Sequence, residues 1–542
     1  MASRHTNRTT TGKQQLDVLV VGAGPTGLTL TAQLQAVGAT CRIVDRQLDR
    51  THESRALAVQ PRTLEILRGL GVAQELVARG NDAVRVELHA GGRVVPVRLF
   101  GLGLDDTSFP FLLFVSQAET EAVLNDHLAA CGVPVERGVE LVAFQADQNG
   151  VTCTLRCADG QTEQARARYL VGCDGAGIPF VGGAYPQTFT LADLEVDGGL
   201  DRNTAYAFIG AVGILFFFPL GRPASWRLLG MHPTLGGSRG APERPTLAEL
   251  QALSDAFSGR GLRLRDPAWL TYFRLQHRHA TRYWAGRVFL AGDAAHVHSP
   301  AGAQGMNTGI QEAWNLGWKL ALVTRGLAEE ALLDSYDTER RPVGRLVVRF
   351  TDRAFTVATS TKPLVRAPHA GAHAGAAADA ALRQGSGVPL PDGLPAWHRL
   401  PAQPGGPGRP AGPAARTQDR RPAADARIAQ DGQLSWLGEA LAAPGFHLLL
   451  CSPPGNWDTD QLTSVRSRYA DILTIHHLTR AAAPGALHDV DGQAFARLGV
   501  DDTARYLIRP DGHIGYRAGG PDLDGLGGYL ARWLPNPTPH PS

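Results

Sequence analysis

The first hydrophobic segment of the chain is a run of apolar residues at 16–21 (LDVLVV), closed by a glycine-rich turn. A short continuous apolar run is typical of a parallel strand that is buried on both faces. Apolar residues then recur at helical spacing over 26–37, and 40–44 (TCRIV) has the composition of a second strand. This order of strand, turn, helix and strand predicts the opening of a doubly wound, Rossmann-like nucleotide-binding domain.

Two later apolar runs, at 167–171 and 286–290, are expected to add strands to the same sheet. Between them, 181–283 is rich in aromatic and β-branched runs and poor in helix signals, which predicts a separate, inserted β-sheet. Helical spacing returns at 308–345, where the Arg341-Pro342 pair is expected to limit a second helix because proline removes a backbone donor.

The last third of the chain begins with 364–415, where Ala, Gly and Pro dominate and predict a linker. Short strands and helices then alternate: a strand at 446–450, a helix at 459–470, a strand at 471–478 and two strands around a Pro-Asp-Gly turn at 506–517. The predicted parts are a disordered tail at 1–15, a nucleotide-binding domain at 16–180 and 284–345, the inserted sheet at 181–283, a helix and linker at 346–419, and a C-terminal domain at 420–537.

Composition narrows the classes of function. With 43% hydrophobic and 19% charged residues among 542, the chain can bury large cores, which excludes whole-chain disorder. Lys plus Arg is 53 and Asp plus Glu is 51, so the net charge of +2 gives no support for a nucleic-acid or membrane surface. The apolar run at 212–220 is too short for the roughly 20 residues that span a bilayer. Six scattered cysteines without a CxxC pair favour a reducing compartment, and we expect a cytoplasmic protein.

The first turn carries the GxGxxG pattern at 22–27 (GAGPTG). In this pattern Gly22 permits the tight turn, Gly24 lets a pyrophosphate approach the backbone, and Gly27 lets the helix pack close to the strand. Asp45 ends the second strand 18 residues after Gly27, in the position that accepts a hydrogen bond from a ribose hydroxyl. The alternative is an ordinary glycine-rich turn, but the flanking strand, helix and acidic residue favour a dinucleotide site.

A second glycine-rich motif follows the strand at 286–290. Gly292-Asp293 begins it, and the stretch 300–307 (PAGAQGMN) leads into a helix. An aspartate on such a turn can hold a sugar-alcohol hydroxyl, and the helix start offers backbone donors that can stabilise negative charge on a flavin ring. Two such loops in one doubly wound domain suggest one long ligand that is bound extended across the sheet.

These motifs, together with 45–46 (DR), 54–56 (SRA), 173–175 (CDG) and 292–296 (GDAAH), resemble the class A flavoprotein monooxygenases. This is the family of p-hydroxybenzoate hydroxylase and phenol hydroxylase, and its bacterial aromatic polyketide hydroxylases are the most similar members. The resemblance implies an α/β fold: a Rossmann-like FAD-binding domain, an inserted β-sheet substrate domain and a C-terminal thioredoxin-like domain. In the related hydroxylases that last domain lacks the CxxC pair, and here Cys451 stands alone within it.

The resemblance also implies FAD as the bound cofactor and assigns residues to it motif by motif. The adenosine and pyrophosphate half would be held by Gly22, Gly24, Pro25, Thr26, Gly27, Asp45 and Arg46. The ribityl and flavin half would be held by Arg55, Gln117, Asp174, Gly292, Asp293, Pro300, Gly302, Gly305, Met306 and Asn307. Pro300, over the reacting face of the flavin, and Arg55 are the candidates for catalysis, although a phosphate contact is the more ordinary role for Arg55.

One segment departs from the family pattern. Asp174-Gly175-Ala176 is followed directly by Gly177-Ile178, so the usual Ser-any-Val-Arg stretch is missing. Either the chain has lost this stretch, which would weaken nicotinamide binding, or residues are absent from the printed sequence, which we consider the better interpretation. Cα atoms spaced by about 3.8 Å through 175–179 would show a true deletion.

The implied reaction is the hydroxylation of an aromatic, phenolic or polyketide-type small molecule through a flavin C4a-hydroperoxide, with NAD(P)H and O2 consumed. Such chemistry needs a dry apolar pocket. The inserted sheet offers Phe216, Phe218, Trp226 and Met231 as substrate contacts. Because strand residues alternate between faces, Phe216 and Phe218 are expected to line the pocket together, with plain core packing as the alternative.

Two other functions remain open at this point: Baeyer–Villiger oxidation or epoxidation on the same fold, and a flavin-binding protein without turnover. His296 and His298 are two histidines without a nearby Cys or Glu in sequence, so we expect loop histidines and no metal site. We expect no nucleic-acid or membrane partner, and a monomer or homodimer.

Overall fold

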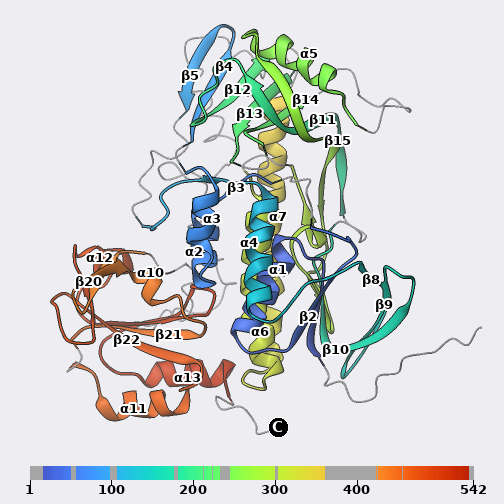
Figure 1. Ribbon diagram of the computed structural model, residues 1–542. Helices are drawn as coiled ribbons and strands as arrows, with labels where there is room; N and C mark the ends of the chain where they lie inside the picture. Colours follow the sequence, from blue (N-terminus) through green and yellow to red (C-terminus); the bar gives the residue numbers. More distant parts are fainter. Residues whose placement is uncertain are drawn as a thin grey trace, which may run out of the picture.

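The computed structural model describes residues 16–50, 56–82, 84–97, 106–175, 181–210, 213–221, 224–231, 244–299, 303–359, 423, 425–453 and 456–535. Three large sheets organise the described residues, and Figure 1 shows them as three regions around the long helices α6 and α7. The predictions for the tail at 1–15, for the linker at 364–415 and for the shortened stretch at 175–179 lie wholly or partly outside the described residues.

The first sheet is the predicted nucleotide-binding sheet. Its strand order is β16-β17-β10-β1-β2-β7, and β9 and β8 continue from β10 on an antiparallel branch. The strands are β1 (Leu16–Val21), β2 (Cys41–Asp45), β7 (Glu136–Arg137), β8 (Val139–Asp147), β9 (Gly150–Cys157), β10 (Thr162–Gly172), β16 (Trp284–Ala285) and β17 (Val288–Leu290). Strand β1 pairs in parallel with β2 and β10, and its Val18, Leu19 and Val20 are fully buried, as a central strand requires.

Helices cover this sheet and connect its strands. They are α1 (Pro25–Ala36), α2 (Pro61–Gly69), α3 (Ala73–Arg79), α4 (Gln117–Ala130) and α6 (Gly305–Thr324), and a short pair, β3 (Ala58–Val59) with β6 (Leu113–Phe114), lies above them. Local sequence explains their starts: Pro25 and Pro61 occupy first-turn positions, where proline's missing N–H costs nothing. Ser116 caps α4 by accepting a hydrogen bond from the Glu119 N–H at 3.2 Å.

The second sheet contains the predicted insertion and extends beyond it. Its order is β18-β15-β11-β14-β13-β12-β4-β5. The strands are β4 (Arg85–Ala90), β5 (Arg93–Val97), β11 (Val181–Asp197), β12 (Thr204–Gly210), β13 (Gly213–Pro219), β14 (Trp226–Met231), β15 (Arg263–His279) and β18 (His296–Val297). Since β4, β5 and β18 lie outside 181–283, this sheet also recruits segments that the sequence analysis placed in the nucleotide-binding domain.

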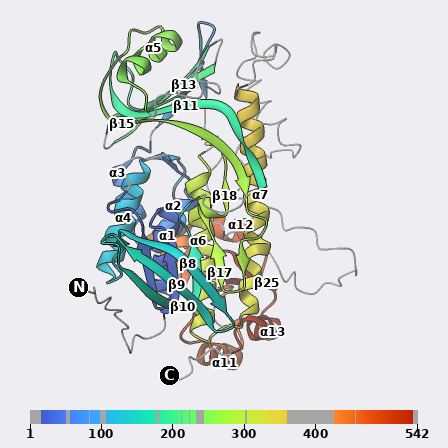
Figure 2. The same ribbon diagram turned by 90° about the vertical axis from the view of Figure 1, so that its right-hand side faces the viewer.

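Helix α5 (Leu247–Ser258) covers the outer face of the second sheet (Figure 2). A capping box of Thr246 and Glu249 begins this helix, and Gly259 ends it in the left-handed conformation at φ +58°. The opposite face of the sheet is turned toward the first domain, and this difference between the two faces matters for the site.

Helix α7 (Ala331–Thr359) corrects one expectation. Pro342 does not limit it, because the helix continues through this residue for 29 residues in all. A proline inside a helix removes one backbone hydrogen bond, but tertiary packing can override that cost. The continuous helix runs from the first domain to the second sheet (Figure 2).

The C-terminal unit has its own mixed sheet, in the order β20-β19-β23-β22-β21-β24-β25. Its strands are β19 (Arg427–Gln430), β20 (Gln433–Trp436), β21 (Phe446–Cys451), β22 (Leu473–Thr479), β23 (Leu487–Asp489), β24 (Ala504–Ile508) and β25 (Ile514–Gly519). Its helices are α10 (Leu437–Ala440), α11 (Thr459–Arg468), α12 (Gln493–Leu498) and α13 (Asp524–Trp533). The predicted strands, helix and Pro-Asp-Gly hairpin of this region are all present.

The described helices include none that is both long and apolar enough to cross a membrane.

Candidate functional site

The turn after β1 has the backbone that the GxGxxG pattern requires. Gly22 has φ +104°, and a Cβ there would lie 2.6 Å from the backbone of Cys173 and Asp174. A Cβ on Gly27 would lie 1.9 Å from the Gly22 carbonyl oxygen. Gly24 is different, because a Cβ on it would meet no atom within 4 Å. Two of the glycines are therefore needed for packing, whereas Gly24 faces open space beside the start of α1, where a phosphate can approach.

Asp45 closes this turn from the second strand. Its Oδ2 accepts a hydrogen bond from the Ala23 N–H at 2.7 Å, and its Oδ1 accepts one from the Gln47 N–H at 2.8 Å. Arg137 lies 3.7 Å from the same carboxylate. Asp45 is thus fixed at the mouth of the turn, as the ribose assignment requires, and the neighbouring Arg46 side chain is exposed.

The second loop lies against the first. Gly292 begins the short helix η1 (Gly292–Ala294) with φ +63°, and the side chain of Asp293 is exposed between two buried neighbours. A Cβ on Gly292 would lie 2.5 Å from Thr26 Oγ1, and a Cβ on Gly309 of α6 would lie 2.3 Å from it. Thr26, at the start of α1, therefore packs against glycines of both η1 and α6. This contact brings together the two glycine-rich loops that the sequence analysis predicted to share one ligand.

The buried Glu312 of α6 is hydrogen-bonded to the second loop. Glu312 Oε2 accepts a hydrogen bond from the Gly292 N–H at 2.9 Å, and its Oε1 lies 2.8 Å from His296 Nε2. Both side chains are fully buried. Burial acts to lower the pKa of His296, but the Glu312 carboxylate outweighs it and raises the pKa. Sequence analysis missed Glu312, because the distance of 16 residues hides its pairing with His296.

The start of α6 is tied to the segment before α2. The Asn307 side chain donates to the carbonyl oxygens of Ala58 at 2.9 Å and Ala303 at 2.7 Å, and it accepts from the Gln60 N–H at 2.9 Å. Its amide thus has a structural role, and any flavin contact at this residue would come from the backbone. The first N–H groups of α6 point out of the helix start, as in any α-helix, and are suited to a polar ring edge.

Gln117 is also engaged with protein. Its Oε1 accepts from the Ala56 N–H at 3.2 Å and its Nε2 donates to Glu121 at 2.8 Å. The backbone of Asp174 lies against Gly22 of the first turn, and part of its side chain is accessible to solvent. Removal from bulk water by the surrounding loops raises the pKa of Asp174. Gly305 and Met306 are at the start of α6, as expected, whereas Arg55, Pro300 and Gly302 lie outside the described residues.

The inner face of the second sheet presents aromatic side chains to the first domain. Phe216 and Phe218 on β13 stack with ring centroids 5.3 Å apart, and Phe218 stacks on Phe114 of β6 at 6.1 Å. Met231 lies on the same face, in a cluster with Phe189 and Leu275. The predicted alternation along β13 is present, with Phe217 buried on the other face.

Trp226 is a correction to the predicted substrate set. Its indole is 2% exposed and lies in the apolar cluster under α5, together with Phe217 and Leu228. Strand alternation explains the difference, because Trp226 and Met231 are separated by an odd number of positions on β14 and point to opposite faces. Trp226 therefore belongs to the core of the sheet and does not share a surface with Phe216.

A buried ion pair occupies the inner face beside these aromatic rings. Arg227 donates to both oxygens of Asp193 at 2.7 Å, and both side chains are fully buried. Trp269 Nε1 donates to the same carboxylate at 2.9 Å, and Arg227 also donates to the Ala56 carbonyl oxygen at 3.0 Å. Ala56 is the residue that Gln117 holds, so this ion pair links the second sheet to the cofactor side of the first domain.

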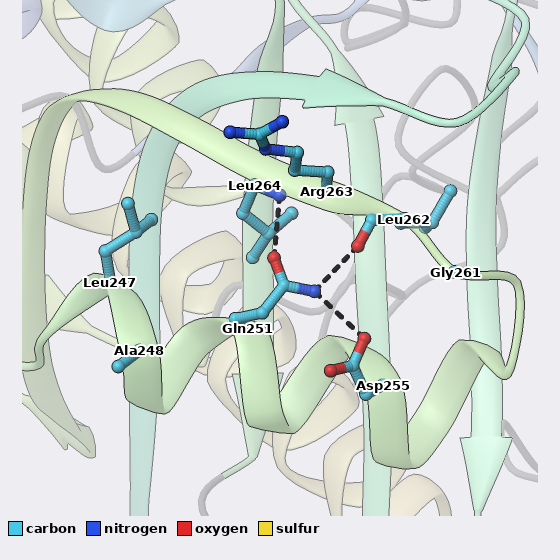
Figure 3. A pocket seen from close by; sticks show the side chains of 8 residues that line it. All are labelled: Leu247, Ala248, Gln251, Asp255, Gly261, Leu262, Arg263 and Leu264. Atoms are coloured by element: carbon cyan, nitrogen blue, oxygen red, sulfur yellow. Dashed lines mark hydrogen bonds between the residues drawn. The ribbon is translucent and has the colours of Figure 1, made fainter.

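A hollow of about 580 Å³ lies on the outer face, between α5 and β15 (Figure 3). Gln251 occupies its polar edge: it accepts from the Leu264 N–H at 2.8 Å and donates to the Leu262 carbonyl oxygen at 2.6 Å and to Asp255 at 2.9 Å. This hollow is on the side of the sheet away from Phe216 and Phe218, so we do not assign the substrate to it. Within the described part of the chain, no three His, Cys, Asp or Glu side chains are placed to hold a metal ion.

Comparison with known proteins agrees with this geometry. Residues 15–351 match the model of a family described as an FAD binding domain. The chain is 40% identical over 345 residues to a 6-methylpretetramide 4-monooxygenase of Streptomyces rimosus, covering 62% of this chain and 61% of that protein. It is 37% identical over 365 residues to a rifampicin monooxygenase of Streptomyces venezuelae, covering 64% of this chain and 72% of the relative. The matched region thus spans less than two thirds of the first of these proteins.

A solved structure extends the similarity to almost the whole chain. The anhydrotetracycline hydroxylase of Streptomyces rimosus superposes with a TM-score of 0.71 at 26% identity, covering 97% of this chain and all of that one. The similarity includes the C-terminal unit, which the family match does not reach. The predicted α/β fold class is confirmed, while the description of the C-terminal unit as thioredoxin-like stays a prediction.

Proposed function

Because the chain belongs to the FAD binding domain family, we propose that it is an FAD-dependent monooxygenase that hydroxylates an aromatic, polyketide-type small molecule with NAD(P)H and O2. The observation that carries this proposal is the contact of Thr26 with Gly292 and Gly309. This contact places the two glycine-rich loops, together called the cradle, side by side, as a single ligand bound by both loops would require.

The residues of the cradle suit FAD by their chemistry. Gly24 leaves room for the pyrophosphate at the start of α1, Asp45 offers a carboxylate to the ribose, and Asp293 offers one to the ribityl chain. The N–H groups at the start of α6 suit the pyrimidine edge of the ring. When bound, FAD would supply the redox chemistry that activates O2.

The chain's own contribution on the substrate side is binding, orientation and the exclusion of water. Phe216 and Phe218 provide a partly exposed apolar surface that faces the first domain, with the buried Met231 on the same face, and flat aromatic rings pack well on such side chains. The names of two relatives, a 6-methylpretetramide 4-monooxygenase and a rifampicin monooxygenase, support a polyketide-type substrate. The inner face of the sheet would hold that ring over the flavin end of the cradle.

The direct test is turnover by the purified, FAD-loaded protein with NADPH or NADH under air. We expect an aromatic polyketide to accelerate NAD(P)H oxidation and to gain one hydroxyl group on a ring, identified by mass spectrometry and NMR. An oxygen inserted into a ring or added across a double bond would instead favour Baeyer–Villiger oxidation or epoxidation. The proposal would be contradicted if the protein bound FAD but no aromatic compound accelerated its oxidation of NAD(P)H.

A matched pair of glycine variants tests the cradle itself. Gly24 and Gly527 of α13 both leave a Cβ free of contacts within 4 Å, so Gly24→Val and Gly527→Val are expected to fold equally well. Only Gly24→Val fills the space assigned to the pyrophosphate, and it should raise the FAD dissociation constant by at least about tenfold. Equal FAD affinity in both variants would contradict the assignment of Gly24.

A further inference from the structure

The hairpin turn between β24 and β25, residues 509–513, joins the C-terminal unit to the first domain. The Asp511 carbonyl oxygen accepts from Arg62 of α2 at 2.7 Å, and Asp511 Oδ2 accepts from the Asn315 amide of α6 at 2.9 Å. Figure 1 shows the C-terminal unit packed beside α2 and α6, on the side away from the second sheet. One short turn therefore contacts both helices.

The contact is a buried network of charges. Arg509 donates to both oxygens of Glu339 on α7, at 2.7 and 3.0 Å, and also binds Asp511. Lys319 on α6 donates to Glu339 at 2.9 Å and to Asn315 at 2.8 Å. The Lys319 side chain is fully buried and that of Asp511 is 1% exposed. Two cations and two anions thus balance one another in the interface between two structural units.

The unit has attachments that do not depend on this network. Arg68 at the far end of α2 donates to Asp425 at 3.0 Å, and the Asp425 N–H donates to the Asp106 carbonyl oxygen at 3.2 Å. Desolvation makes a buried ion pair a poor source of net stability, and apolar residues of similar volume can often replace it without loss. Its better-attested use is to fix the register of the parts that it joins. We therefore interpret the network at Arg509 as fixing the position of the C-terminal unit relative to α2, α6 and α7.

The positions that it sets are those of the cofactor cradle. Arg62 is two residues beyond Gln60, whose N–H is bound by Asn307 at the start of α6. Asn315 lies eight residues further along α6, which is about 12 Å at the helical rise per residue. The starts of the two helices are thus joined through Asn307 and Gln60, and the same turn contacts α2 in its first turn and α6 about three turns from its start.

We propose that Arg509 is a positioning residue for the FAD cradle. It holds Asp511 and Glu339 in place. The backbone of Asp511 then contacts Arg62 near the start of α2, and the two carboxylates contact Asn315 and Lys319 in the middle of α6, so the two helices are fixed against each other. The inference deepens the proposed function, on which it depends for the identity of the ligand. It gives the C-terminal unit a role in cofactor binding although none of its described residues lies at the cradle.

The test compares three variants of the full-length protein. Arg509→Met removes the shared cation. Arg62→Gln removes the link from the turn to α2, together with the ion pair that Arg62 forms with Glu65 within α2. Tyr506→Phe is the control, because its hydroxyl donates to the Leu498 carbonyl oxygen at 2.7 Å within the C-terminal unit itself. For each variant we would measure the FAD dissociation constant of the apoprotein, the visible circular dichroism of bound FAD and the melting temperature.

We expect Arg509→Met to raise the FAD dissociation constant by about tenfold and Arg62→Gln by about threefold, each with a changed flavin dichroism spectrum. Tyr506→Phe should lower the melting temperature and leave FAD affinity and the spectrum unchanged. Unchanged affinity and spectrum in Arg62→Gln would overturn the proposal even if Arg509→Met did not fold. A loss of FAD affinity that parallels the fall in melting temperature in all three variants would also overturn the proposal. A wild-type protein that bound FAD but did not hydroxylate would contradict the proposed function alone, since this test measures binding.

Discussion

The two faces of the second sheet are built from the same strands and differ in kind. The outer face, under α5, is closed by Trp226, Phe217, Leu228 and other apolar residues that are almost fully buried. The inner face carries the half-buried rings of Phe216 and Phe218 beside the Asp193–Arg227 ion pair. The outer face thus has the composition of a protein core, whereas the inner face has a buried ion pair and partly exposed rings, which a core does not need.

This difference indicates that the outer face stabilises the sheet, whereas the inner face is suited to binding a ligand. The burial of apolar area stabilises the outer face of the sheet. On the inner face, two charges have been removed from water and two aromatic rings have been left partly exposed, and both features cost stability. A surface arranged in this way, opposite a dinucleotide cradle, is suited to binding a flat apolar ligand in a defined orientation.

The largest effect is expected at the ion pair. Arg227→Met leaves the Asp193 carboxylate buried without its cation, so the free energy of unfolding should fall by about 3–5 kcal/mol, measured by denaturant titration. The double variant Asp193→Leu with Arg227→Met removes both charges and should recover a large part of that loss. Equal losses in the single and double variants would show that the pair contributes through packing alone, and the two faces would then be alike.

The next effect contrasts neighbouring phenylalanines on β13. Phe217→Ala opens a cavity in the fully buried cluster under α5 and should cost about 3 kcal/mol of unfolding free energy. Phe216→Ala truncates a half-buried ring and should cost about 1 kcal/mol, because solvent can fill the space. In turnover assays the order should reverse, with a larger rise in KM for Phe216→Ala. Parallel changes in stability and KM in the two variants would remove the functional distinction between the faces.

These contrasts also show how far the sequence could be interpreted. The first sheet, the two glycine-rich loops and the C-terminal hairpin were predictable because their signals are local: apolar runs, glycines at fixed spacing and a Pro-Asp-Gly turn. Alternation along β13 also placed Phe216 opposite Phe217. Trp226 was misassigned because it lies on a different strand, and the phase of one strand relative to another depends on the intervening loop and on pairing across the sheet.

The buried charges were beyond prediction for the same reason. Asp193 and Arg227 are 34 residues apart, and Glu312 and His296 are 16 apart, so nothing local marks them as partners. Lys319 is fully buried and Arg509 is 12% exposed, and both pair with Glu339, which lies 20 and 170 residues from them in the sequence. The extent of the second sheet was underestimated because β4 and β18 reach it from distant parts of the chain. Pro342 was taken as a helix end, but packing kept α7 continuous.

The smallest effect is a pH dependence of the outer face. His89 stacks on Phe208 with ring centroids 4.7 Å apart, Glu87 lies 3.2 Å from its Nε2, and Arg260 lies over the same Phe208 ring. Burial, helped by the Arg260 charge, lowers the pKa of His89. The unfolded chain therefore takes up this proton first, and stability that is complete above about pH 6.5 is lost as the pH falls through the folded value.

His89→Phe keeps the ring stack and removes the titration, so it should reduce the loss of unfolding free energy between about pH 7.5 and about pH 5.5. The difference between the two proteins isolates this group from the other histidines, whose contributions cancel when they are distant from His89. FAD affinity should have the same pH dependence in both proteins, because His89 faces the outer side of the sheet. If the variant instead altered the pH dependence of FAD binding, the two faces would be coupled through the sheet and could not be assigned separate roles.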